Sequence, residues 1–576
     1  MYIKKTYSKN SEHYSIIYNI RVNGKRTSKV YENIGNFDKL KLRAGNEDPI
    51  LWLNNYVNSL NQKQKENNLP VLIEKYENRL ISKYQTRTFN GGYLFLQKIY
   101  YDLKLNNICD VISNKYQFKF DLNSILSRLV YGRILYPSSK IATFEFSKSL
   151  LEQPNFDSHQ IYRALEIIAK EDDFIQSELY KNSSKYSPRN NKILYYDCTN
   201  FFFEIDEAED DKQYGHSKEN KPNPIVQMGL FMDGDGIPLT FGITPGNTNE
   251  QKTLKPLEEK IINDFNLSKI VVCTDAGLAS KSNRLLNNTN EKRFITTQSI
   301  KKLKEDLKKW ALDTTGWHLP GYEDKNIDIS KLETDDELKE KFKNATFYKE
   351  RWIKDGNLEQ RLIVTYSLKY RDYLRHIREG QIERAKKIIE SNPKKLGKIR
   401  QNDPKRFINV TSTTESGEVA IENYYTLSEE KINEEKRYDG YYAVCTNLED
   451  EALEIIKVNH RRWEIEESFR IMKSEFEARP VYLKRQDRIK AHFMICFLAL
   501  TIYRYLEKKL DNKYTVCEII DTLKNMNFLY EKDIYYSPEY TRTDLTDLLH
   551  EKFNFRTDYE TINYKNIKKI FKQTKK

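Results

Sequence analysis

Apolar and polar positions change their spacing along the chain, and these changes divide it into regions. Residues 1–50 open with alternating apolar and polar side chains around Asn23-Gly24, a pattern that predicts a small basic β-hairpin. Residues 51–188 carry apolar side chains at helical spacing, which predicts a helical domain. From residue 193 onward, short apolar runs alternate with amphipathic segments, which predicts an α/β fold.

The first part of the α/β region, residues 189–299, has a recognisable order of elements. It predicts a strand at 193–203, a hairpin at 225–232 and 237–243, a helix at 249–264, a strand at 269–274, a helix at 280–288 and a strand at 293–299. This order matches an RNase H-like core, in which the first and fourth strands lie side by side. We therefore expect 193–203 and 269–274 to be neighbours.

Two aspartates stand on those two strands. Asp197 lies inside a run rich in aromatic and β-forming residues, where an unpaired carboxylate costs several kcal/mol unless a cation balances it. Asp275 follows the apolar run 269–274, at the strand end where α/β sheets bind ligands. Taken alone, Asp275 fits a helix N-cap equally well. Together, the two acids predict a metal site.

A third acid lies on the segment 459–473, which lacks Gly and Pro and predicts one helix. At about 100° per residue, Asn459, Arg462, Glu466 and Lys473 fall within a wedge of about 60°. A carboxylate between two cations suits a divalent metal beside a phosphodiester, although Arg462 and Glu466 also fit an ordinary surface ion pair. Three other glutamates fall outside this wedge: Glu464, Glu467 and Glu475.

The distance along the chain between Asp275 and Glu466 predicts an inserted domain. Because the third acid of this fold should come from the next core helix, residues 300–436 must be an insertion, and residues 437–510 complete the core. Residues 511–576 predict a basic helical region. Asp233 and Asp235, in Asp-Gly-Asp-Gly, are interpreted as turn residues.

Charge is concentrated at the two ends of the chain. The net charge is +12; residues 1–44 hold ten Lys and Arg against three acids, and residues 561–576 hold six Lys and no acid. Basic ends on a nearly balanced middle indicate a polyanionic partner, and the interleaved Tyr and Phe favour nucleic acid over membrane. The codon usage of an AT-rich genome is the alternative cause of this composition.

Several functional classes are excluded by what the sequence lacks. The six Cys form no CxxC pair and the eight His have no zinc-site spacing, so we expect reduced thiols and no zinc. Asn23–Ser28 lacks the leading glycine of a P-loop, so no nucleotide cofactor is expected. The apolar run 491–505 is too short to span a bilayer and predicts a buried helix that supports the sheet. No secretion signal opens the sequence, so we expect a cytoplasmic protein.

Three motifs, taken together, carry a resemblance. They are Tyr-Tyr-Asp197-Cys-Thr, Val-Val-Cys-Thr-Asp275-Ala-Gly-Leu and Arg462-Trp-Glu-Ile-Glu466-Glu-Ser-Phe-Arg-Ile-Met-Lys473. The chain resembles the bacterial insertion-sequence DDE transposases, and among them the cut-and-paste group with a tyrosine–arginine–glutamate–lysine helix signature and a β-rich insertion. Residues 242–247 and 478–482 also resemble that group. One position departs from it: Asn459 stands where the family has tyrosine. The departure concerns a phosphate or base contact of that tyrosine and not the metal ligands.

The resemblance implies a mechanism and a set of partners. Asp197, Asp275 and Glu466 would be the catalytic residues and would bind two Mg²⁺ or Mn²⁺ ions. Arg462, Lys473, Asn459 and Trp352 are the candidates for DNA contact; for Trp352, which stands for an aromatic that stacks on a flipped base, a core position is the alternative.

The expected partner is double-stranded DNA, as terminal inverted repeats and as target. A homodimer would hold two ends in a synaptic complex, associated with the nucleoid when bound, and the helical region 51–188 would bind the DNA ends. A structure-specific nuclease of the same fold and an inactive, domesticated DNA-binding derivative are the alternatives.

Overall fold

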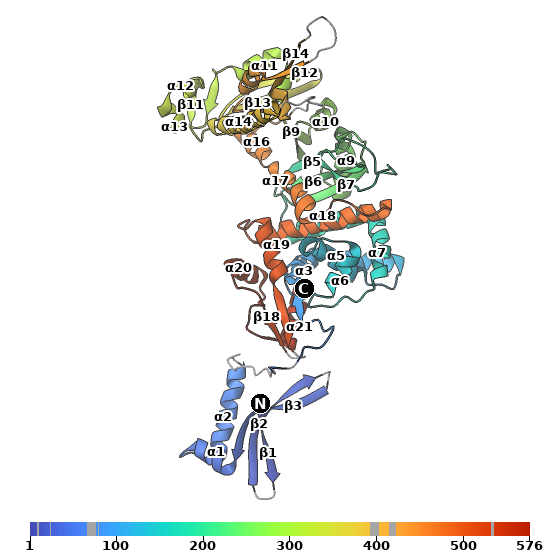
Figure 1. Ribbon diagram of the computed structural model, residues 1–576, viewed down its shortest axis with the longest axis vertical. Coiled ribbons are helices and arrows are strands. Elements are labelled where there is room, and N and C mark those ends of the chain that lie inside the picture. Colours follow the sequence, from blue (N-terminus) through green and yellow to red (C-terminus); the bar gives the residue numbers. More distant parts are fainter. Residues whose placement is uncertain are drawn as a thin grey trace. The chain divides into compact units, whose positions relative to one another are not determined.

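The structure is a computed structural model that describes residues 1–8, 11–22, 25–65, 77–78, 80–391, 402–413, 422–531 and 535–576 (Figure 1). The chain divides into two compact units. One is Met1–Ala164 together with Tyr505–Lys576, and the other is Leu165–Arg504.

The unit Leu165–Arg504 is built on a ten-stranded mixed sheet in the order β11-β10-β12-β13-β16-β9-β8-β5-β6-β7. Its strands are β5 (Ile193–Phe202), β6 (Ile225–Asp233), β7 (Pro238–Pro245), β8 (Ile270–Thr274), β9 (Lys292–Thr297), β10 (Trp317–Leu319), β11 (Tyr322–Ile327), β12 (Phe347–Asp355), β13 (Leu358–Tyr366) and β16 (Tyr441–Thr446). Its helices include α8 (Asp172–Tyr186), α9 (Leu254–Phe265), α10 (Lys281–Leu286), α11 (Glu305–Leu312), α14 (Leu368–Glu390), α15 (Glu429–Lys436), α16 (Ala452–His460), α17 (Trp463–Arg470) and most of α18 (Gln486–Lys509).

Strand β5 is the centre of the predicted core. It pairs antiparallel with β6 and parallel with β8, and β8 pairs parallel with β9. The predicted neighbourhood of the first and fourth strands is therefore confirmed. The aromatic and β-branched residues of β5 explain this central position, because the strand is covered on both faces and most of its side chains are buried. Asp233 is the last residue of β6. Its carboxylate forms an ion pair with Arg189 and accepts hydrogen bonds from the backbone N–H groups of Asp235 and Ile237, in agreement with its interpretation as a turn residue.

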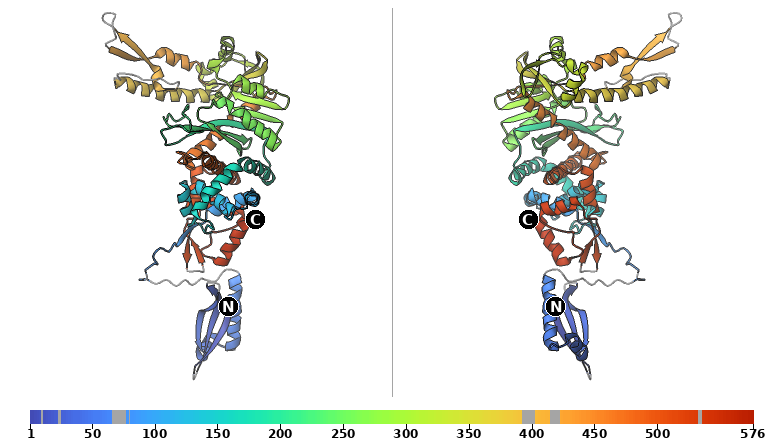
Figure 2. Two further views of the ribbon diagram at one scale, coloured as in Figure 1. Left: turned by 90° about the vertical axis from the view of Figure 1, so that its right-hand side faces the viewer. Right: turned by 90° about the vertical axis from the view of Figure 1, so that its left-hand side faces the viewer.

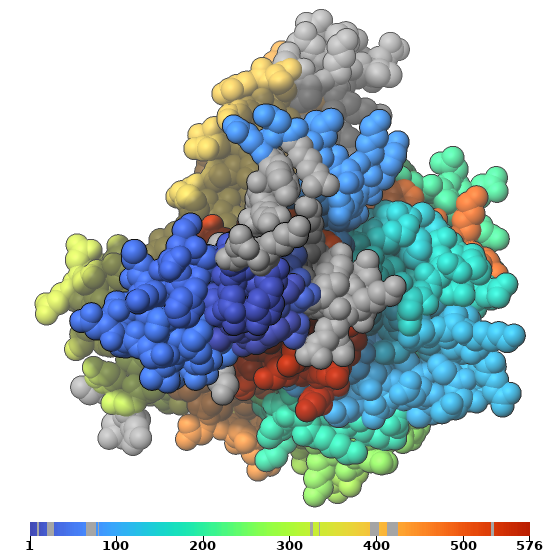
Figure 3. Space-filling model, turned by 90° about the horizontal axis from the view of Figure 1, so that it is seen from below, coloured from blue at the N-terminus to red at the C-terminus, as the bar shows by residue number. Residues whose placement is uncertain are grey.

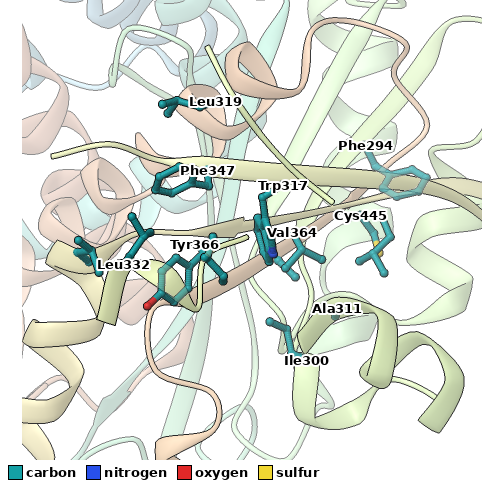
Figure 4. Packing of buried hydrophobic residues seen from close by; sticks show 14 of the residues in the cluster. Phe294, Ile300, Ala311, Trp317, Leu319, Leu332, Phe347, Val364, Tyr366 and Cys445 are labelled. Atoms are coloured by element: carbon teal, nitrogen blue, oxygen red, sulfur yellow. The ribbon is translucent and has the colours of Figure 1, made fainter. Parts of the chain in front are cut away.

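The segment 300–436 extends this sheet through four of its strands, β10 to β13, because β13 pairs with β16 and β16 with β9. Trp317 is fully buried in the core of this extension, among Phe347, Val364 and Tyr366 (Figure 4). Beyond the sheet, α14 and α15 pack with the hairpin of β14 (Ile408–Thr413) and β15 (Glu422–Leu427) around Phe407 and Ile432 (Figure 2).

Helix α18 contains the apolar run that the sequence predicted to be a buried support. Among the described residues it is the one helix with the length and composition to cross a membrane, and 94% of its most apolar window is buried. Phe493 packs against Phe201 of β5 at 4.9 Å between ring centroids, and Phe497 packs against Phe241 of β7 at 5.0 Å. The prediction of a helix supporting the sheet is confirmed, although the helix is longer than the apolar run.

The other unit combines helices from both ends of the chain. They are α3 (Tyr93–Asp102), α4 (Leu105–Tyr116), α5 (Leu122–Leu135), α6 (Lys140–Ser147), α19 (Val516–Asn525), α20 (Asp544–Phe553) and α21 (Tyr564–Thr574); α7 (Ser158–Lys170) contains the boundary between the units. The region 511–576 is not purely helical as predicted, because β17 (Asn527–Glu531) pairs with β18 (Tyr535–Pro538) and with β4 (Thr88–Asn90), and β18 pairs with β19 (Ile562–Asn563). Pairing with a strand more than four hundred residues away gives these short segments their structure.

The first 65 residues form a module with a core of its own. Strands β1 (Tyr2–Ser8), β2 (Ser11–Val22) and β3 (Lys25–Asn36) make an antiparallel sheet, and α1 (Phe37–Ala44) and α2 (Pro49–Lys65) pack on it around Ile16, Leu40 and Leu53 (dark to medium blue in Figure 3). The prediction of a two-stranded hairpin is therefore wrong, because the sheet has three strands. The predicted turn at Asn23-Gly24 lies outside the described residues.

The two glycines of the segment 242–247 differ in their surroundings. A methyl group at Gly246 would overlap the carbonyl oxygens of Ile225 and Gln213, whereas at Gly242 it would lie in ordinary contact with Leu257 at 3.4 Å. We expect Gly246→Ala to destabilise the fold by about 1–3 kcal/mol and Gly242→Ala to change it by less than about 1 kcal/mol. Urea unfolding of the two variants measures this. Equal losses of stability would contradict the placement of this loop.

Candidate functional site

Asp197 and Asp275 lie beside each other on two parallel strands. The register pairs Tyr195 with Cys273, so two residues further on Asp197 stands next to Asp275. Each carboxylate accepts one local backbone hydrogen bond, Asp197 from the Cys198 N–H at 2.7 Å and Asp275 from the Leu278 N–H at 2.9 Å. Asp275 therefore caps a turn and also belongs to the acid pair, so the two interpretations of this residue do not exclude each other.

Burial makes the acid pair electrostatically unfavourable. It raises the pKa of Asp197 to about 6, the positive charges of Lys218 and Arg462 oppose that rise, and the negative charge of Asp275 adds to it. The cations present therefore do not fully offset the effect of burial on Asp197. Such a pair at a strand end is where an additional cation would be stabilised most.

The segment 459–473 is not the single helix that the sequence predicted. Helix α16 ends at His460, α17 begins at Trp463, and a turn of π-helix follows at Ile471–Glu475. At the break the backbone makes bonds between residues three apart, from the N–H of Arg462 to Asn459 and from that of Ile465 to Arg462. Hydrophobic periodicity carries no signal for this change in hydrogen bonding.

Arg462 connects the third acid to the other two. Its guanidinium lies 2.8 Å from Glu466, whose side chain is 55% exposed. Burial lowers the pKa of Arg462, but the negative charges of Glu466, Asp197 and Asp275 outweigh burial and hold it above its ordinary value. Within the described part of the chain, no three His, Cys, Asp or Glu side chains form a cluster that could hold a metal ion. The structure thus places Asp197 beside Asp275, whereas Glu466 forms an ion pair with Arg462.

Lys473 belongs to a second group of cations near Asp197. Its ammonium lies 3.3 Å from Glu219 and 5.6 Å from the centre of the Phe201 ring. Burial and the positive charge of Lys218 lower the pKa of Lys473 to about 8, against the attraction of Asp197. Arg479 also pairs with Glu219.

Lys218 is a site residue that the sequence did not identify. It lies between β5 and β6, donates to the carbonyl oxygen of Cys198 and stands 3.3 Å from Glu250. Burial lowers its pKa, but the charges of Asp197 and Glu250 outweigh burial and raise it. A polar connecting segment has no periodicity, so the available signal was its position soon after Asp197 in the sequence.

Asn459 and Trp352 have different surroundings. Asn459 is buried, and its amide donates to the Tyr442 hydroxyl at 2.6 Å, so its side chain faces the protein interior. Trp352 is 46% exposed on β12, whereas Trp317 is buried and Trp310 packs under the ammonium of Lys349. Of the three tryptophans in 300–436, Trp352 is therefore the one available to a partner. Trp463, 57% exposed at the start of α17, is a second exposed tryptophan that the sequence did not identify as a candidate.

A family model described as "Transposase DDE domain" matches residues 200–502, which is more than half of the chain. The chain belongs to this transposase family. The matched range includes Asp275 and Glu466 and begins just after Asp197. No curated protein sequence matches the transposase. A solved structure with partial similarity is the cryo-electron microscopy structure of the piggyBac transposase synaptic complex with hairpin DNA, at 10% identity and a TM-score of 0.35, covering 75% of this chain and 78% of that chain.

The role of Lys218 in the transposase can be tested through pH. Because the pKa of Asp197 is about 6, binding of Mn²⁺ should weaken as pH falls through that value. Replacing Lys218 with Gln removes a cation that favours the charged carboxylate, so the midpoint of this loss should move to higher pH. Lys221→Gln, on the same connecting segment, is the matched control. Electron paramagnetic resonance of free Mn²⁺ measures binding, and an unchanged midpoint in Lys218→Gln would contradict the assignment.

Proposed function

We propose that this chain is an insertion-sequence DNA transposase that binds terminal inverted repeats and catalyses metal-dependent strand cleavage and transfer by a cut-and-paste route. The observation that carries the proposal is the pair Asp197 and Asp275 on adjacent parallel strands, beside Arg462, in a chain of the DDE transposase family. The strand order β9-β8-β5-β6-β7 supports an RNase H-like core. The protein acts in the cytoplasm on double-stranded DNA, as a homodimer that holds two ends.

Asp197, Asp275 and Glu466 would hold two Mg²⁺ or Mn²⁺ ions. When bound, the ions lower the pKa of an attacking water or 3′-hydroxyl and stabilise the leaving oxygen. The residues fit this role because burial raises the pKa of Asp197, which a bound cation would offset, and all three donors are carboxylate oxygens. Glu466 is held by a partly exposed ion pair with Arg462, and such pairs contribute only about 0.2–1 kcal/mol, so a cation can compete for it.

Arg462, Lys473 and Lys218 bind and orient the DNA strand. When Glu466 leaves Arg462, the guanidinium can donate two parallel hydrogen bonds to a phosphate. Lys473 has a pKa of about 8 and is mostly protonated at neutral pH, and a phosphate beside it favours the charged form further. Lys218 keeps Asp197 ionised at neutral pH. The three cations thus bind the substrate phosphate and favour the charged form of Asp197, while the three acids would hold the metal ions.

The roles of the acids predict a loss of chemistry without a loss of binding. Asp197→Ala, Asp275→Ala and Glu466→Gln should each reduce Mg²⁺-dependent nicking of the element's own end DNA by roughly 10³-fold or more. Glu467→Gln, the adjacent residue of α17, is the control and should retain activity. Gel assays of nicking and of duplex binding measure both properties.

Two outcomes would contradict the proposal. Nicking at the normal rate by any of the three acid variants refutes the assignment of the site. Metal-dependent cleavage with no joining of the cut ends to target DNA identifies a structure-specific nuclease instead.

The raised pKa of Asp197 predicts that the site destabilises the fold. The folded-state pKa, about 6, lies above the ordinary value, so ionisation of Asp197 costs folding free energy that builds up as pH rises from about 4 to about 6 and is fully present above pH 6. Asp197→Asn removes that cost, and we expect the variant to be more stable at pH 7.5 by roughly 1–2 kcal/mol, after a discount for partial solvent access. Below about pH 4 the difference should disappear, because Asp197 is then largely neutral in both the folded and the unfolded chain.

Thermal unfolding at the two pH values tests this. Asp235→Asn, in the β6–β7 turn, is the control. A stability difference that grows as pH falls would have the wrong sign and would refute the account of Asp197.

A further inference from the structure

Helix α21 presents two faces with different surroundings. Ile567, Ile570 and Thr574 are buried on one side. The Gln97 amide of α3 donates to the Thr574 hydroxyl at 2.9 Å, so this side faces α3. At about 100° per residue, the lysines of the helix fall within a wedge of about 100° on the opposite side. This lysine face consists of Lys565, Lys568, Lys569 and Lys572, and all four side chains are exposed.

The positive charge of the lysine face is not balanced by acids. Within the described part of the chain, none of its four lysines forms an ion pair, whereas Lys575, just after the helix, pairs with Glu152 at 2.5 Å. The last acid in the sequence, Glu560, lies before the helix. The whole chain holds 96 Lys and Arg against 84 Asp and Glu, so a lysine-rich composition alone does not explain a face without acids.

The length and chemistry of the lysine face suit the backbone of a duplex. From Lys565 to Lys572 the face extends about 10 Å along the helix axis, at about 1.5 Å per residue. Duplex DNA carries one negative charge per about 1.7 Å of its axis, so several phosphates lie within reach of a face of this length. The lysine ammonium binds phosphate oxygens as a point charge, and phosphate contacts carry no sequence information directly. The face therefore suits binding to DNA of any sequence.

Two other anionic partners fit the lysine face less well. A basic helix that binds a membrane surface inserts its apolar face into the lipid, but here Ile567 and Ile570 are buried inside the protein. Single strands are bound through rows of aromatic side chains. In α21 the exposed aromatic residue is Tyr564, and the ammonium of Lys568 lies 4.3 Å from the centre of its ring.

We propose that the lysine face of α21 binds the phosphate backbone of duplex DNA without regard to sequence. The helix belongs to the compact unit that does not contain the acid pair, so this surface is additional to the candidate active site. The inference rests on the proposed function for the choice of DNA over duplex RNA. The contact adds affinity for any duplex and leaves the recognition of particular end sequences to other parts of the chain.

The test compares two double variants of the full-length protein that remove the same charge. Lys569→Gln/Lys572→Gln alters the lysine face, and Lys119→Gln/Lys513→Gln is the control; all four side chains are exposed and belong to the same compact unit. Lys569→Arg/Lys572→Arg keeps the two charges. Binding to a fluorescein-labelled duplex is measured by anisotropy over a range of salt concentrations, with the element's end and an unrelated sequence of equal length. Circular dichroism and thermal unfolding check that each variant is folded.

We expect Lys569→Gln/Lys572→Gln to weaken binding by roughly 60-fold at about 0.1 M salt, because each phosphate contact contributes about 0.9 to the slope of log K against log salt. The slope should fall by about 1.8, and the affinities of variant and wild type should meet near about 1 M salt. The loss should be equal for the end duplex and the unrelated duplex. The control and the arginine variant should bind within about twofold of the wild type.

Three results would overturn the inference. Equal weakening by the control shows an effect of net charge and not of this face. A loss that persists at about 1 M salt, or one confined to the element's end, shows that the lysines do not act through the phosphate backbone. Unchanged duplex binding with lost binding to vesicles that contain phosphatidylserine identifies a membrane contact instead.

The inference and the proposed function can fail separately. Each result that overturns the inference leaves Mg²⁺-dependent nicking at saturating DNA concentration unaffected. Conversely, a protein that binds duplex through Lys569 and Lys572 but does not cut DNA with Mg²⁺ overturns the proposed function and supports the inference.

Discussion

The parallel pairing of β5 with β8 is the constraint on which the candidate site depends. These strands lie more than sixty residues apart along the chain, and their ladder sets Asp197 beside Asp275. The pairing brings like charges together in a partly buried place, which opposes folding by itself. The apolar residues around the acids make the arrangement possible: β5 and β7 receive the aromatic side chains of α18, and that packing holds the strands in register.

The distribution of cations follows from this constraint. Arg462 interacts with three acids at once, and Lys218 and Lys473 both act on Asp197. Three cations around three carboxylates would balance in number, yet burial and the negative charge of Asp275 keep the pKa of Asp197 near 6. Lys218 and Lys473 are also paired with Glu250 and Glu219. Lys218 and Lys473 are thus each shared between Asp197 and an outer glutamate. This arrangement keeps three positive groups near Asp197 without bringing its pKa back to the ordinary value.

Sequence patterns predicted the strands of the core and the adjacency of Asp197 and Asp275, because an apolar run has a length and spacing that show in the sequence and the order of elements limits the topology. They did not predict the break between His460 and Trp463, which depends on hydrogen bonds made after the chain has folded. They did not identify Lys218 either, because it lies in a polar segment between β5 and β6 that has no periodicity. The strand that the predicted hairpin left out is β1, because the predicted turn at Asn23-Gly24 separates only β2 from β3.

The extension of the sheet by residues 300–436 also has a consequence for the site. The extension is attached through β16, which pairs with β9, and this pairing brings Tyr442 to the region of α16. There the Tyr442 hydroxyl forms hydrogen bonds with Thr297 at 2.9 Å and with the side-chain amide of Asn459 at 2.6 Å. Its electrostatic interaction with Arg462 raises the pKa of the arginine. Asn459 is the position at which the sequence motif has asparagine where the resemblance led us to expect tyrosine. Asn459 is buried and its side-chain amide donates to the Tyr442 hydroxyl, so strand β16 and the end of α16 are joined by a hydrogen bond next to Arg462.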